Sequence, residues 1–60
     1  MLKIEMKTGN AYFREEDGGL CSYAVAKILR EVAEKIENGR TEGKIIDGNG
    51  NCVGSFVLED

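Results

Sequence analysis

Oxygen-bearing side chains recur at every second position within the segment IIDGNGNCVGSF, at Asp47, Asn49 and Asn51. Calcium-binding loops place ligands at their first, third and fifth positions in this way, and they also require glycine at the sixth position and glutamate at the twelfth. Counted from Asp47, those two positions hold Cys52 and Leu58. Because neither residue fits, we predict that the segment binds no metal ion. Its Asn49-Gly50 pair instead indicates a two-residue type I′ hairpin turn.

Residues suited to other chemistry are sparse. The sequence contains no histidine, so it lacks the commonest general base and metal ligand. Its glycines do not form a dinucleotide-binding fingerprint, and the lysine-threonine pair Lys7-Thr8 is not preceded by the glycines of a phosphate loop. The two cysteines, Cys21 and Cys52, are most simply interpreted as small, partly buried side chains. We therefore predict that the protein is not an enzyme and uses no cofactor.

Length and composition predict one small folded domain, residues 1–60. The chain is 42% apolar and 32% charged, which is too apolar for a disordered tail. A chain of this size buries only about 60% of its unfolded surface and lies near the limit of independent stability. Charged residues interrupt the apolar ones in the N-terminal MLKIEMK, and no segment is long enough to cross a bilayer. We predict a cytoplasmic protein with reduced thiols and no membrane association.

Alternation of apolar and charged residues predicts a first strand over residues 2–7. Gly9-Asn10 follows this strand, and glycine in the first position of a two-residue loop is typical of a type II′ hairpin turn. The turn predicts a short second strand over residues 11–14, with Met6 opposite Phe13 and Glu5 opposite Arg14.

The strongest pattern in the chain predicts an amphipathic helix over residues 23–38. Ser22 is the expected N-cap, and Asn38-Gly39 favours the left-handed conformation that ends many helices. The apolar residues recur at helical spacing and form one stripe. They are Val25, Ile28, Leu29, Val32, Ala33 and Ile36.

A second hairpin is predicted after the helix, with strands over residues 44–48 and 51–58. Centring its turn on Asn49-Gly50 places Ile46 opposite Val53 and Ile45 opposite Gly54. The expected architecture is therefore an α+β domain of ββαββ order, with one amphipathic helix packed on one face of an antiparallel sheet.

The predicted register gives the sheet two different faces. We expect the helix to cover the face that bears Phe56 and Leu58, because it has the larger apolar groups. The uncovered face then carries four apolar interface candidates, Tyr12, Ile46, Val53 and Val57. It also carries four cations as a basic rim, Lys3, Lys7, Arg14 and Lys44, against a single acidic residue, Glu5.

Two functions are compatible with such a face. An apolar patch with a polar rim is typical of a protein interface, and a small chain gains stability by forming a homodimer or by binding a protein partner through it. Alternatively, an aromatic ring on a basic open sheet is typical of proteins that bind single-stranded nucleic acid. A face that is simply solvated is the third possibility. We predict the protein interface, with nucleic-acid binding as the alternative.

The segment AKILREVAEKIENGRTEGKIIDGNGNCVGSF resembles a family of short bacteriophage and prophage proteins of bacteria. In that family an amphipathic helix ends in an acidic, glycine-containing turn and is followed by a strand, a D-x-N-G-N turn and a closing strand with an aromatic residue. The opening KIEMKTGNAYF is also similar to their N-termini. The resemblance implies a phage or prophage accessory protein, and it carries over no catalytic or binding residue.

Overall fold

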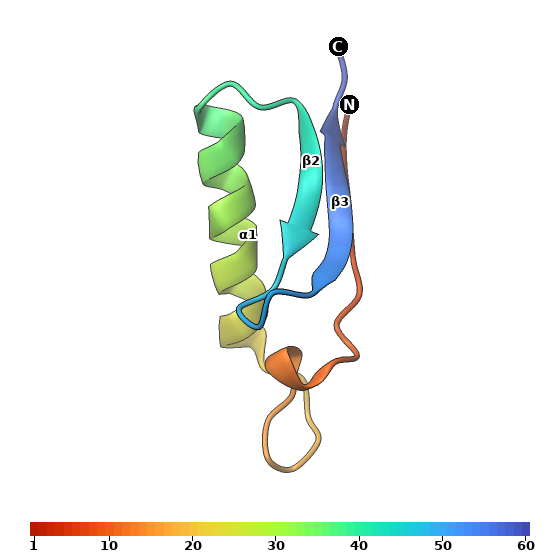
Figure 1. Cartoon of the computed structure of the whole chain (residues 1–60), viewed down its shortest axis with the longest axis vertical. Coiled ribbons are helices and arrows are strands. Elements are labelled where there is room, and N and C mark those ends of the chain that lie inside the picture. Colours follow the sequence, from red (N-terminus) through yellow and green to blue (C-terminus); the bar gives the residue numbers. More distant parts are fainter.

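The computed structural model describes all of residues 1–60 and contains one helix beside a three-stranded sheet (Figure 1). The elements follow the chain in the order β1 (Leu2–Met6), the 3₁₀ helix η1 (Ala11–Phe13), α1 (Ser22–Glu37), β2 (Glu42–Ile46) and β3 (Cys52–Leu58). The predicted α+β fold of ββαββ order, with one helix on an antiparallel sheet, is confirmed. Its second β element is reduced to a single bridge between Arg14 and Leu20.

The sheet has the strand order β1-β3-β2, and both pairs of neighbours are antiparallel. The central strand β3 pairs Phe56 with Ile4 on one side and with Gly43 on the other. Directly opposite residues point to the same face of a sheet. The register therefore places Leu2, Ile4 and Met6 of β1 on the same face as Phe56.

The loop between β2 and β3 is one residue longer than predicted. Asp47 donates its backbone N–H to the carbonyl oxygen of Asn51, which closes a three-residue loop, and Gly50 alone in that loop has a positive φ, 85°. A three-residue loop whose last residue is left-handed is a common hairpin form, whereas a type I′ turn requires a positive φ at both central residues. The predicted type I′ turn is wrong, because Asn49 has a negative φ.

A β-bulge compensates for the longer loop. Near the loop Ile46 lies opposite Cys52, and beyond the bulge Ile45 lies opposite Gly54, as predicted. Val53 is the extra residue between these pairs. The predicted pairing of Ile46 with Val53 is therefore wrong, and the bulge turns Val53 toward the core, where only 6% of its surface is exposed.

The segment predicted as the strand over residues 11–14 forms η1 instead. Asn10 donates from Nδ2 to Oδ2 of Asp47 at 2.6 Å, so the chain after β1 crosses to the loop of the second hairpin. Phe13 is then completely buried beside α1. The strand prediction is wrong here because β1 pairs with β3, and burial of Phe13 favours a compact turn over a hairpin.

The helix α1 spans Ser22–Glu37, one residue earlier than predicted at each end. Cys21 occupies the N-cap position without a side-chain hydrogen bond, so the predicted Ser22 cap is wrong. The C-terminal prediction is confirmed, because Gly39 follows Asn38 with φ of 95°.

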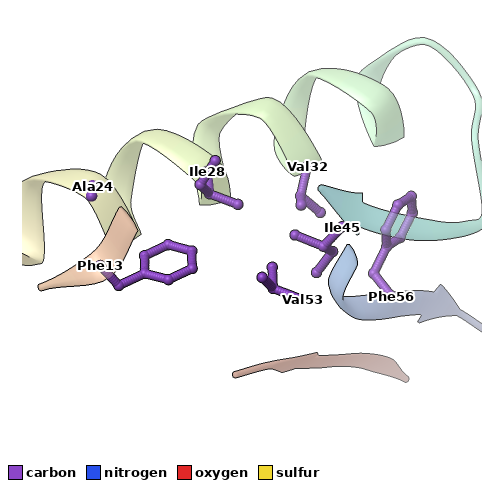
Figure 2. Close-up of a cluster of buried hydrophobic side chains, with 7 residues drawn as sticks. All are labelled: Phe13, Ala24, Ile28, Val32, Ile45, Val53 and Phe56. Carbon is purple, nitrogen blue, oxygen red and sulfur yellow. The ribbon is translucent and has the colours of Figure 1, made fainter. Parts of the chain in front are cut away.

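The hydrophobic core is a small cluster between α1, η1 and the strands β2 and β3 (Figure 2). It contains seven buried apolar side chains, namely Phe13, Ala24, Ile28, Val32, Ile45, Val53 and Phe56. The helix contributes its 24/28/32 stripe, so the buried centre is rotated away from the centre of the predicted stripe. As a result, Leu29 remains exposed.

Candidate interaction surface

The four interface candidates predicted from the sequence do not form one surface. Val53 lies in the core, as described above, and Tyr12 belongs to η1 and not to the sheet. The Tyr12 ring is half-buried: it packs edge-on to Phe13 at 5.1 Å between ring centroids and occupies the space beside Gly48. Ile46 is 42% exposed near the loop, and Val57 is half-buried between β1 and β2. The prediction of a shared apolar face is wrong for Val53 and Tyr12.

The predicted basic rim is also divided. Lys3 and Glu42 lie on either side of Val57, and Glu5 and Lys44 lie on either side of Ser55, so both signs of charge alternate on this face. Lys7 follows β1 and lines a groove with Asn10 and Cys52. Arg14 lies outside the sheet, where its guanidinium donates to the carbonyl oxygen of Gly18 at 3.3 Å. No single cluster of cations results.

Apolar side chains are instead exposed on the face of the sheet that also bears Phe56. Leu2 is 47% exposed, and Ile4 and Leu58 are each 39% exposed. The register brings them together. Leu2 lies directly opposite Leu58, and Ile4 lies two residues along β1 from Leu2, on the same face. They remain open because β1 is separated from α1 by the other two strands, as the β1 ribbon beyond β3 in Figure 2 illustrates.

The helix leaves this region open by packing against β2 and η1. On one flank, Glu31 lines a pocket with Ile46, and the Nζ of Lys35 donates to the carbonyl oxygen of Lys44 at 3.5 Å. Leu29 lies on the opposite flank of the buried stripe from Glu31, because successive helical residues are rotated by about 100°. On that flank Leu29 is 40% exposed.

We call the exposed apolar set formed by Leu2, Ile4 and Leu58 the open side. Phe56, which lies opposite Ile4, and the half-buried Met6 of the same face connect it to the core. A solvent-exposed apolar patch of this kind is typical of a surface that contacts another macromolecule. The open side is therefore the candidate interaction surface of this chain.

Asp47 is the one buried charged residue, and its carboxylate holds the hairpin loop together. Oδ1 accepts from the backbone N–H groups of Asn49 and Asn51, both at 2.9 Å. Oδ2 accepts from Nδ2 of Asn10 at 2.6 Å and more weakly from Nδ2 of Asn51 at 3.4 Å. Burial alone raises the pKa of Asp47, but these hydrogen bonds outweigh it and lower the pKa below its ordinary value. The carboxylate thus stabilises the loop and ties it to Asn10.

The open side was missed at the sequence level because β1 was expected to form a hairpin with residues 11–14. Alternation with Lys3 and Glu5 places Leu2, Ile4 and Met6 on one face of the strand, and the predicted architecture lays the helix over that face. A signal was nevertheless present: a single helix covers about two strands, because helices are about 10 Å wide and strands are about 4.8 Å apart.

Comparison of the chain with protein-family models, with curated proteins and with solved structures found no match. The structure contains no helix with the length and apolar character needed to span a membrane. Function must therefore be inferred from the surface itself.

Proposed function

We propose that this protein is a small, non-enzymatic interaction module that self-associates through its open side. The observation that carries the proposal is the exposure of Leu2, Ile4 and Leu58 on the same sheet face as the buried Phe56. Scattered apolar residues are normal on protein surfaces, but these three are contiguous and border the core.

The small core supports the same conclusion. Only 8 of the 60 residues are buried. Removing apolar surface from water stabilises a fold by about 25 cal/mol per Å². Contact between two copies through the open side would extend the core beyond what one chain can enclose, and folding of the chain would be coupled to association.

The test compares two isoleucines of nearly equal exposure, Ile4 on the open side and Ile46 near the hairpin loop. Sedimentation equilibrium is measured for the wild type, Ile4→Gln and Ile46→Gln across micromolar to millimolar concentrations. We expect the wild type and Ile46→Gln to associate equally well. We expect Ile4→Gln to associate roughly tenfold more weakly, because its amide must be desolvated at the contact.

Two results would contradict the proposal. A wild type that stays monomeric throughout this range would exclude self-association. Equal weakening by both substitutions would show that association does not use the open side in particular.

The alternative function, single-stranded nucleic-acid binding, gains no support from the alternating charges around Val57 and Ser55. We retain a phage or prophage origin as a prediction that rests on the resemblance described above. A cytoplasmic location is likewise proposed, and it is supported by two cysteines that are both free thiols.

A further inference from the structure

The strand β1 has one edge without a partner. It lies at the end of the strand order β1-β3-β2, so only one of its edges faces β3. The carbonyl oxygen of Met1 accepts from the N–H of Glu59, and the N–H of Lys7 donates to the carbonyl oxygen of Val53. Backbone groups of successive residues in a strand point to alternate edges. The N–H and C=O groups of Leu2, Ile4 and Met6 therefore point away from β3.

The opposite edge of the sheet is protected. The outward carbonyl oxygen of Lys44 in β2 accepts from Nζ of Lys35, and α1 packs along this strand. An unprotected edge strand is a template for pairing with another strand, and natural proteins usually cover or charge such an edge. On β1 the outward-facing backbone belongs to Leu2, Ile4 and Met6, and the two charges of the strand, Lys3 and Glu5, are of opposite sign, so they can complement a second copy of the strand.

The charges on β1 select one register for pairing with a second copy of itself. A two-fold axis at Ile4 would place Lys3 of each copy opposite Glu5 of the other, and Leu2 opposite Met6. A two-fold axis at Lys3 would place the two Lys3 side chains opposite each other, and an axis at Glu5 would do the same for the two Glu5 side chains. Opposite charges across strands stabilise a sheet, and like charges directly opposite destabilise it.

Backbone hydrogen bonding excludes the remaining nearby registers. A shift by one residue would present the backbone of Lys3 or Glu5, which already faces β3, to the second copy. The register with Ile4 at the axis uses all three outward-facing residues of each copy, and it keeps every apolar side chain on one face and every charged side chain on the other.

We propose that two copies of the chain join by antiparallel pairing of β1 with β1 about a two-fold axis at Ile4. This inference rests on the proposed self-association and specifies its geometry. The product is a continuous six-stranded sheet in which the open sides of both copies are adjacent. Such a contact is isologous and closed, so it yields a dimer and not a fibre.

The test exchanges the two charges of β1 one at a time. In Lys3→Glu and in Glu5→Lys, each homodimer would place like charges opposite each other at two positions, and we expect roughly tenfold weaker association of each variant alone. In an equimolar mixture the two variants restore opposite charges at both positions. Random pairing would make half of all dimers heterodimers. We therefore expect native mass spectrometry to show a heterodimer fraction well above one half.

The matched control makes the same exchange on β2, with Glu42→Lys and Lys44→Glu on the same face at the other edge of the sheet. These variants change the net charge identically, and we expect each of them to dimerise as the wild type does and their mixture to be statistical. A dimeric wild type with a statistical mixture of the β1 variants would overturn the β1 pairing and leave self-association intact. A monomeric wild type would overturn both proposals. Preferential pairing of the β2 variants would place the contact at the β2 edge and overturn the pairing of β1 with β1.

Discussion

At the scale of single residues, Asp47 shows how one carboxylate can join two segments that are distant in sequence. Its four hydrogen bonds close the hairpin loop and attach Asn10, which precedes η1. The alternating Asp47, Asn49 and Asn51 could be identified from the sequence as part of a turn. The link to Asn10 could not be predicted, because nothing local relates residues 37 positions apart.

The ionisation of Asp47 makes the stability of the protein depend on pH. Its pKa is lower in the folded protein than in the unfolded chain, so the stability contributed by the carboxylate is fully present above the unfolded-state pKa and is lost as the pH falls through the folded-state pKa. We expect Asp47→Asn to be less stable than the wild type at neutral pH. We also expect this difference to narrow steadily as the pH is lowered below about 4.

Urea unfolding at a series of pH values measures this difference. The control is Asn10→Ala, which keeps the carboxylate but removes one of its donors, and whose pH dependence should lie between those of the wild type and Asp47→Asn. A difference between the wild type and Asp47→Asn that is the same at every pH would show that the charge of Asp47 does not stabilise the fold.

At the scale of elements, the hairpin of β2 and β3 was predicted correctly away from its loop and wrongly beside it. The Asn49-Gly50 signal located the turn, but a three-residue loop and a two-residue loop contain the same residues and differ only in their backbone angles. The bulge at Val53 absorbs the extra loop residue, so the pairing of Ile45 with Gly54 is the same in both arrangements. Val53 and Cys52 exchange faces, because Val53 turns into the core and Cys52 lies opposite Ile46.

Because of the bulge, we expect a lysine substitution to have opposite effects on stability at Val53 and at Ile46, two residues that the predicted register places side by side. Val53→Lys would bury an ammonium group in the core without a partner, so we expect this variant to lose its cooperative unfolding transition. Ile46→Lys replaces an exposed side chain, and we expect its free energy of unfolding to stay within about 1 kcal/mol of the wild-type value. Circular dichroism during thermal unfolding measures both. A well-folded Val53→Lys protein would show that Val53 faces solvent.

At the scale of the whole molecule, the fold class and the helix were predictable from periodicity, whereas the strand order was not. Pairing between β1 and β3 brings Leu2 opposite Leu58, across nearly the whole chain. Closing so long a loop costs conformational entropy, and only the contacts of the complete sheet offset that cost. The local signal at Gly9-Asn10 favoured a hairpin that the tertiary structure replaces with η1. The same error concealed the candidate surface, since the open side exists only because β1 lies at the far edge of the sheet.

Coupling between folding and association predicts a thermal midpoint that depends on protein concentration. For a two-state dimer of chains this size, we expect the midpoint to rise by roughly 3–6 °C for each tenfold increase in concentration, because association stabilises only the folded state. Lys3→Glu should show a smaller rise over the same range, since like charges would face each other in its dimer. The double variant with Lys3→Glu and Glu5→Lys should recover the wild-type dependence, because it restores opposite charges with their positions exchanged. Differential scanning calorimetry measures all three proteins, and a midpoint of the wild type that is independent of concentration would mean that one chain alone encloses a sufficient core.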